Sequence, residues 1–300
     1  MEKPKNIFAI VGPKGGVGKS TISANLAIAL SELGKKVIAV DLDLGTSNLH
    51  AIFGIREYKY TLDDFVFNRV RNLSDIVLDT EINNLGIICG GDVPGIANMA
   101  YQKKLKLIRH LSKLDCDLVL LDLAPGASYN VVDFSIIAQR GLLVTTPEVP
   151  SLLNVYSFIK ATVFRRLTFY FKHNKCVELL ELLEKAKDFD NYPHLNTMEG
   201  LLGKAREINS DMADSARKIL SGLKPFVVIN RVFTKSDAGA GEVIQKLMRQ
   251  YLSIDSGVIM TIREDKAVKN AIARMKPIMI DAPRSMFSRD IKQIAATLFK

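Results

Sequence analysis

The residues with the clearest chemical potential stand at positions 12–21 and read GPKGGVGKST. They fit the pattern G-x-x-x-x-G-K-[ST] of a phosphate-binding loop, in which successive backbone N–H groups surround phosphate oxygens. Lys19 is placed to reach the β and γ phosphates of a nucleotide, and the Ser20 hydroxyl can bind Mg²⁺. Side chains would hold the backbone away from the anion, so this chemistry needs the glycines at Gly15, Gly16 and Gly18.

Carboxylates follow two other segments that read as buried strands. Asp41 and Asp43 come directly after one apolar run, and Asp122 follows another. Aspartates at such strand ends can hold Mg²⁺ and orient an attacking water molecule. Gly126, in the sequence DLAPG, can bring a backbone N–H close to a terminal phosphate, and that contact would make the segment a switch.

An amide and a guanidinium, Asn230 and Arg231, end a later strand-like run. An amide side chain can pair with the exocyclic amine and a ring nitrogen of adenine. Ligands of parallel sheets gather at the carboxyl ends of the strands. We therefore expect a single site where the predicted strands end, at Gly12, Asp41, Asp122, Thr146 and Asn230.

Strand-like and helical patterns alternate along the chain, which predicts an α/β fold with a mostly parallel sheet and helices on both faces. Strands are expected at 6–11, 36–40, 85–89, 117–121, 141–145 and 226–229, with weaker candidates at 257–260 and 277–280. Helices are expected at 19–33, 101–114 and 131–139. The phosphate-binding loop would then lead from a buried strand into a helix N-terminus, which favours anions.

About 80 residues separate the strand that ends at 145 from the one that starts at 226, without a strand pattern. A βαβ unit needs only about 30 residues. We therefore expect one domain over residues 1–300 with a helical insertion at 160–222. The stretch that contains this insertion should form helices at 151–171, 175–187 and 197–220. The apolar stripes of these helices are compatible with extra packing and also with a surface that docks a partner.

Composition favours a reduced, cytoplasmic protein. The 300 residues are 48% hydrophobic with a mean hydropathy of +0.11, and no apolar run reaches the roughly 18 residues of a membrane span. No secretory signal is evident, and Cys89, Cys116 and Cys176 are too scattered for a disulfide framework or a zinc or iron–sulfur site. The net charge of +9 is spread along the chain, so it fits a solvated surface as well as a polyanion-binding one.

The motifs together resemble those of the MinD/ParA class of P-loop ATPases. GPKGGVGKST is similar to the deviant Walker A motif KGGxGK[ST], and DLAPG to the switch II pattern of that class. The segment 41–54, DLDLGTSNLHAIFG, resembles switch I of MinD and especially of FlhG. The resemblance covers residues 6–157 and 226 onward, and the helical insertion departs from it.

The resemblance implies a slow, Mg²⁺-dependent ATPase that forms a homodimer when ATP is bound. Lys14 would be the signature lysine that contacts nucleotide in the facing subunit, Lys19 would bind β/γ phosphate, and Asp43 would position the attacking water. The other nucleotide contacts would come from Gly15, Gly16, Val17, Gly18, Ser20, Thr21, Asn48, Gly126, Asn230 and Arg231. The residues that would bind or support Mg²⁺ are Ser20, Asp41, Asp43 and Asp122.

Within this class, we expect a MinD/FlhG-type switch that positions or counts a structure such as a flagellum or division site, with a protein partner that stimulates hydrolysis. A ParA-type partition ATPase on DNA is the alternative. Residues 288–300 are weakly amphipathic and read as a closing helix rather than a membrane helix. Peripheral association with membrane or nucleoid stays open. FlhG proteins carry an N-terminal segment that activates a GTPase partner, and the five residues that precede the first predicted strand argue against that part of an FlhG-like role.

Overall fold

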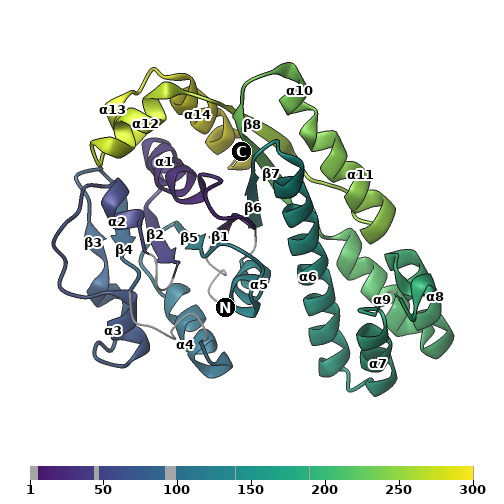
Figure 1. Cartoon of the computed structure of the whole chain (residues 1–300). Helices are drawn as coiled ribbons and strands as arrows, with labels where there is room; N and C mark the ends of the chain where they lie inside the picture. Colours follow the sequence, from purple (N-terminus) through teal and green to yellow (C-terminus); the bar gives the residue numbers. More distant parts are fainter. Residues whose placement is uncertain (1–5, 44–46, 92–98, 139, 189, 300) are drawn as a thin grey trace.

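The computed structural model describes residues 6–43, 47–91, 99–138, 140–188 and 190–299. Within them lies one eight-stranded sheet in the order β3-β4-β2-β5-β1-β6-β7-β8 (Figure 1). Neighbouring strands are parallel except β3 and β4. The strands are β1 (Asn6–Val11), β2 (Val37–Leu42), β3 (Leu78–Asp79), β4 (Leu85–Ile88), β5 (Leu118–Leu123), β6 (Arg140–Thr145), β7 (Phe226–Val232) and β8 (Ile259–Arg263).

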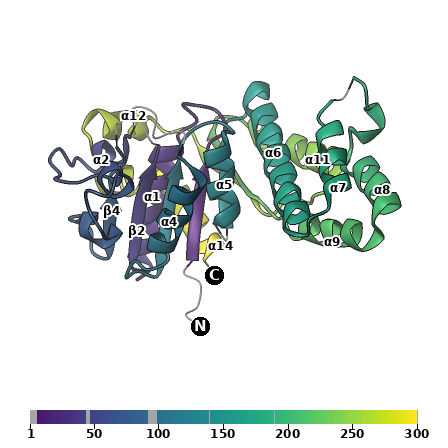
Figure 2. The same ribbon diagram turned by 90° about the horizontal axis from the view of Figure 1, so that it is seen from below.

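Helices cover both faces of the sheet, as predicted (Figure 2). Successive side chains of a strand point to opposite faces, so Phe8 and Ile10 join one core while Ala9 and Val11 join the other. The first core includes α1 (Lys19–Glu32), α2 (Leu49–Ile52), α12 (Lys266–Ala273), α13 (Ile278–Asp281) and α14 (Met286–Leu298). The second includes α3 (Leu62–Val66), α4 (Tyr101–Leu111), α5 (Tyr129–Ile137), α6 (Val149–His173) and α11 (Ala240–Leu252).

Between β6 and β7, the described part of the chain contains helices joined by short turns and no strand. The long helix α6 is followed by α7 (Val177–Lys185), α8 (Met198–Ile208) and α9 (Ser210–Ser221), which pack around its far end beside α11 (Figure 2). The expected single helix at 197–220 is wrong, because Asn209 interrupts it and its side chain accepts a hydrogen bond from Met212 N at the start of α9. The limits 160–222 of the predicted insertion stay a prediction.

The weakest strand candidate, 277–280, is also wrong: it is the short helix α13, which Pro277 precedes at the N-cap. Ile278 and Met279 are buried against α1, where the Asn25 side chain accepts a hydrogen bond from Met279 N at 2.8 Å. The other weak candidate, 257–260, is confirmed as β8, although that strand starts two residues later.

The C-terminal segment is a closing helix, as expected. Helix α14 buries Phe287, Ile291, Ile294 and Leu298 against α1 and β8. Its apolar side is therefore part of the core in this structure. Across the described residues, no helix combines the length and the apolar character needed to cross a membrane. The short helix α10 (Lys235–Ala238) lies between β7 and α11, and short 3-10 helices occur at Leu73–Ile76 and Pro193–Leu195.

Candidate nucleotide-binding site

The loop between β1 and α1 has the backbone shape that its glycines permit. Gly16 and Gly18 have φ angles of 79° and 91°, in the left-handed region where a side chain causes strain. A Cβ on Gly18 would also lie 2.4 Å from Nδ2 of Asn230. That amide, at the end of β7, donates to the carbonyl oxygen of Val17 at 2.8 Å. Asn230 therefore supports the loop directly, and its predicted contact with adenine stays a prediction.

Lys19 is the centre of the site. Its ammonium is only 7% exposed and donates to Asp122 Oδ1 at 2.9 Å and to Ser20 Oγ at 3.2 Å. Asp43 Oδ2 lies 4.0 Å from the same nitrogen. The structure thus places three of the predicted residues, Ser20, Asp43 and Asp122, around the Lys19 ammonium, although the four residues come from three separate segments of the chain.

Asp122 is fully buried at the end of β5. Oδ1 accepts hydrogen bonds from Lys19 and from the hydroxyl of Ser23 at 2.7 Å, whereas the buried Oδ2 has no hydrogen-bond partner among the described residues. Carboxylate and hydroxyl oxygens are the ligands that Mg²⁺ takes in proteins. Asp122 Oδ2, the Ser20 hydroxyl and the Asp43 carboxylate together form a set of oxygen donors that fits Mg²⁺.

Asp41, directly beside Asp122 in the register of β2 and β5, anchors the segment that follows β2. Its Oδ1 accepts from the Asp43 N–H at 3.0 Å. Its Oδ2 accepts from the hydroxyl of Ser47 at 2.7 Å and from two backbone N–H groups, those of Asn48 and Leu49, at 3.1 and 3.0 Å. Burial, together with the nearby Asp122, raises the pKa of Asp41 to about 6. A metal-binding role for Asp41 stays a prediction.

Gly126 connects the segment after β5 to the loop. It has a φ angle of 91°, and its N–H donates to the carbonyl oxygen of Gly12 at 3.3 Å. A residue with a side chain would be strained in this conformation. The glycine therefore places the DLAPG segment against the phosphate-binding loop, as a switch segment requires.

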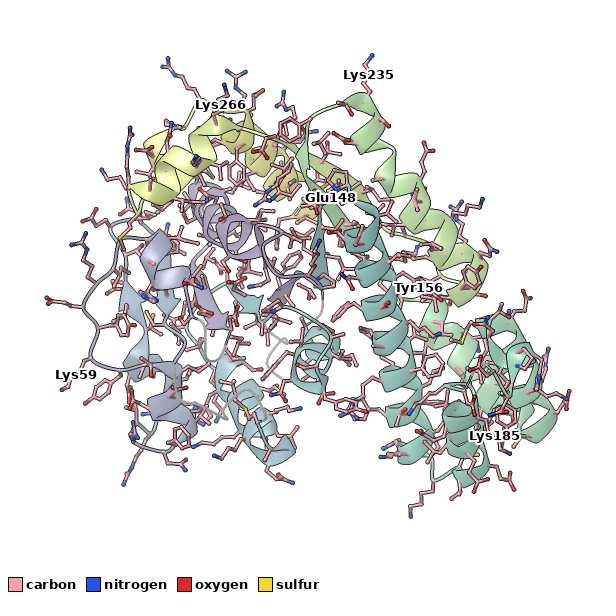
Figure 3. The ribbon with its side chains drawn as sticks, in the orientation of Figure 1. Lys59, Glu148, Tyr156, Lys185, Lys235 and Lys266 are labelled. Atoms are coloured by element: carbon pink, nitrogen blue, oxygen red, sulfur yellow. The ribbon has the colours of Figure 1, made fainter. Side chains whose placement is uncertain are left out.

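Two adjoining hollows open over these residues. The first, of about 440 Å³, is lined by Lys14, Gly15, Gly16, Gly18, Lys19, Ser20, Thr21, Asp43, Asn48, Ala51, Ile52, Pro125, Arg231, Ile272 and Met275. The second, of about 710 Å³, shares Gly18, Thr21, Arg231 and Ile272 with it and extends between the starts of α6 and α12. Figure 3 labels Glu148 and Lys266 at these two helix starts. Together the hollows provide a small phosphate cradle and a larger chamber beside it.

The rim of the hollows carries exposed positive charge. Lys14 is exposed, and Arg231 is exposed at an irregularity in the pairing of β7 with β8, with a φ angle of 60°. The pKa of Glu148 is lowered by a hydrogen bond with the Thr146 side chain, and the positive charges of Lys14 and Arg231 lower it further. These two cations therefore face the same opening.

Sequence patterns missed several residues of the site. Ser23 and Ser47 hold Asp122 and Asp41, and Ile272 and Met275 form a wall of the phosphate cradle. The two serines could have been found from their spacing after the motifs. No local sequence pattern marks Ile272 and Met275 as site residues, because only the tertiary fold brings their segment to the hollow.

A glycine-rich loop between β1 and α1, with aspartates at the ends of neighbouring parallel strands, defines a P-loop nucleotide-binding protein. Residues 8–278 match the CbiA family, the CobQ/CobB/MinD/ParA nucleotide binding domain. The chain belongs to this family, and the expected resemblance to the MinD/ParA class is confirmed.

Two curated relatives show how far the similarity extends. Antiactivator FleN of Pseudomonas aeruginosa is 34% identical over 162 residues, which cover 52% of this chain and 56% of the relative. Septum site-determining protein MinD of Helicobacter pylori is 36% identical over 148 residues, which cover 49% of this chain and 54% of the relative. The chain thus spans about half the length of the curated relatives it matches.

Solved structures agree on the fold over nearly the whole chain. MinD of Pyrococcus horikoshii, complexed with Mg-ADP, matches with a TM-score of 0.65 and 21% identity over 99% of this chain and 96% of its own. A ParA family ATPase of Chlorobium tepidum matches with a TM-score of 0.63 and 20% identity, over 97% and 99%. At these identities the likeness shows the fold alone.

Proposed function

We propose that the protein is a Mg²⁺-dependent ATPase that works as an ATP-driven dimerisation switch of the MinD/FlhG type. The observation that carries this proposal is the contrast between two lysines of one loop. Lys19 is buried among the ligands of its own site, whereas Lys14 is exposed on the rim of the same hollow. One lysine therefore serves the nucleotide of its own chain, and the other can reach a nucleotide held opposite.

Phosphate binding rests on the loop itself. Backbone N–H groups of residues 15–21 bind the phosphate oxygens, and Lys19 adds its charge once it leaves Asp122 for the anion. Ser20, Asp43 and Asp122 would hold Mg²⁺, which neutralises charge on the phosphate oxygens. The larger chamber, lined by Pro147, Asn230 and Arg231, receives the base and the sugar.

Hydrolysis in this proposal depends on Asp43. Its carboxylate lines the phosphate cradle beside Lys19, where it can accept a hydrogen bond from an attacking water molecule. Turnover is slow, because a carboxylate at this position orients water but is a weak base.

Dimerisation follows from Lys14. Two chains facing each other across their hollows would each place Lys14 on the phosphates of the other, so ATP would stabilise the dimer and the dimer would retain ATP. The switch would position a structure such as a flagellum or division site or regulate its number, with a partner that stimulates hydrolysis. Association of the ATP form with vesicles or with duplex DNA, measured by sedimentation, distinguishes this role from that of a partition ATPase.

The test is the rate of phosphate release per chain at increasing protein concentration. For a dimer-dependent ATPase the rate per chain rises with concentration, and Lys14→Ala abolishes that rise. Lys246→Ala, which removes an exposed lysine from α11, is the matched control and behaves as wild type. A concentration-independent rate, equal in wild type and Lys14→Ala, would contradict the proposal.

A further inference from the structure

A separate pocket of about 340 Å³ lies on the sheet face covered by α5 and α6. It is bounded by the end of α5, the middle of α6, the beginnings of β6 and β7 and the connection after α9. None of its lining residues belongs to the two hollows of the nucleotide site. The pocket is therefore distinct from the two hollows of the nucleotide site.

Arg166 is the unusual residue of this pocket. Among the described residues, its fully buried Nε has no hydrogen-bond partner and its guanidinium forms no ion pair. Burial lowers its pKa. The neighbouring Arg165, in contrast, has a counter-ion, because its Nε and a terminal nitrogen both donate to the Asp133 carboxylate. Arg166 is half-buried, and it lacks such a counter-ion among the described residues, which is unfavourable for its partly desolvated charge.

The charged residues that line the described part of the pocket all have the same sign. Arg140 and Lys224 also line the pocket, and no aspartate or glutamate is among its described lining residues. Arg140 donates to the carbonyl oxygen of Leu298 at 2.6 Å, so one of its nitrogens is already used. The pocket therefore favours an anion, and Arg166 is the group with unused donors.

The rest of the lining is mostly apolar. Its apolar lining residues include Leu143, Phe158, Ile159, Leu223 and Phe226. The hydroxyl of Thr162 already donates to the carbonyl oxygen of Phe158, so it offers no free donor to a ligand. The volume accommodates on the order of ten non-hydrogen atoms.

We propose that this pocket binds a small organic carboxylate, with its charged group on the Arg166 guanidinium and its apolar body against Phe158 and Ile159. The planar guanidinium matches a carboxylate through two parallel hydrogen bonds. The apolar wall distinguishes such a ligand from an inorganic anion, which would leave that surface without a partner.

The experiment uses 4-(trifluoromethyl)benzoate as the probe, followed by fluorine NMR with wild-type protein. The neutral isostere 4-(trifluoromethyl)benzamide reports the contribution of the charge. We expect the benzoate to bind at millimolar concentration or below, and Arg166→Met to weaken it roughly tenfold or more. Arg166→Lys keeps the charge and retains part of the affinity, and Arg217→Met, at an exposed arginine of α9, has no effect.

Three results would overturn the proposal. They are equal binding of benzoate and benzamide, unchanged binding to Arg166→Met, and no binding to wild type at millimolar concentration. Binding that Lys19→Met removes but Arg166→Met leaves intact would place the probe in the phosphate-binding loop and would also refute the proposal. None of these results depends on whether the protein hydrolyses ATP.

Discussion

Asp133 on α5 holds three helices together, and its replacement by asparagine should be among the most destabilising polar changes in the molecule. Its Oδ2 accepts from Lys104 of α4 at 2.6 Å, and its Oδ1 accepts from Arg165 of α6 at 2.7 Å. Asp133 is 3% exposed and Lys104 is 7% exposed. Removal of one member of a buried ion pair costs about 3–5 kcal/mol, because the remaining charge is uncompensated. We expect a loss of this size for Asp133→Asn.

Urea unfolding at neutral pH measures that loss, and a double-mutant cycle with Lys104→Met isolates the pair. Glu207→Gln is the control, because the pair of Lys204 with Glu207 is exposed on α8 and is worth less than about 1 kcal/mol. The reasoning is refuted if Asp133→Asn costs no more than Glu207→Gln, or if the coupling between Asp133 and Lys104 is zero.

The pH dependence of the same variant has a definite sign. Burial alone would raise the pKa of Asp133, but hydrogen bonds from Arg165 and Lys104 outweigh it and lower that pKa below the ordinary value of 3.8. A group whose pKa is lowered on folding stabilises the protein above its unfolded pKa, and this contribution is lost as pH falls through the folded pKa. The difference in unfolding free energy between wild type and Asp133→Asn should therefore be constant near neutral pH and shrink below about pH 4. A difference that stays constant down to pH 3 would contradict the assignment.

Three further changes have expected outcomes. Gly18→Ala should cost about 1–3 kcal/mol in unfolding free energy, because Gly18 has a φ angle of 91° and lies close to the Asn230 amide. Gly15→Ala should change the unfolding free energy little, because there is open space around Gly15. Equal costs for the two changes would contradict this geometry. Lys19→Met should weaken ADP binding roughly 10- to 100-fold in calorimetry, and unchanged affinity would exclude the loop as the phosphate site. Ile291→Ala should cost about 2–5 kcal/mol in urea unfolding, since this residue of α14 is fully buried, and a cost near zero would mean that the helix does not close the core.

The sequence predicted the parts of the fold that short-range patterns encode. The apolar runs of the central strands are buried on both faces, so their periodicity and flanking residues are unambiguous, and β1, β5 and β7 start or end within a residue or two of the expected positions. The 277–280 segment is apolar enough for a strand but too short to be distinguished from a helix by pattern alone. Its position against α1, where Asn25 accepts from the Met279 N–H, decides the outcome.

The site was predicted as a set of residues but not as a set of contacts. The loop glycines, Lys19, Asp43 and Asp122 converge because parallel strands place their carboxyl ends at one edge. No local pattern could show that Asn230 supports the loop through the Val17 carbonyl, because 213 positions separate the two residues. Nor could it show that both oxygens of Asp41 already accept hydrogen bonds from the following segment.

The central claim is that ATP drives two chains together through Lys14. The most direct test is the solution mass of wild type, Asp43→Ala, Lys14→Ala and the double variant, each measured with ADP and with ATP. We expect monomers with ADP, a dimer that accumulates with ATP in Asp43→Ala because hydrolysis is blocked, and loss of that dimer when Lys14→Ala is added. A mass that is the same with either nucleotide in every variant would contradict the switch.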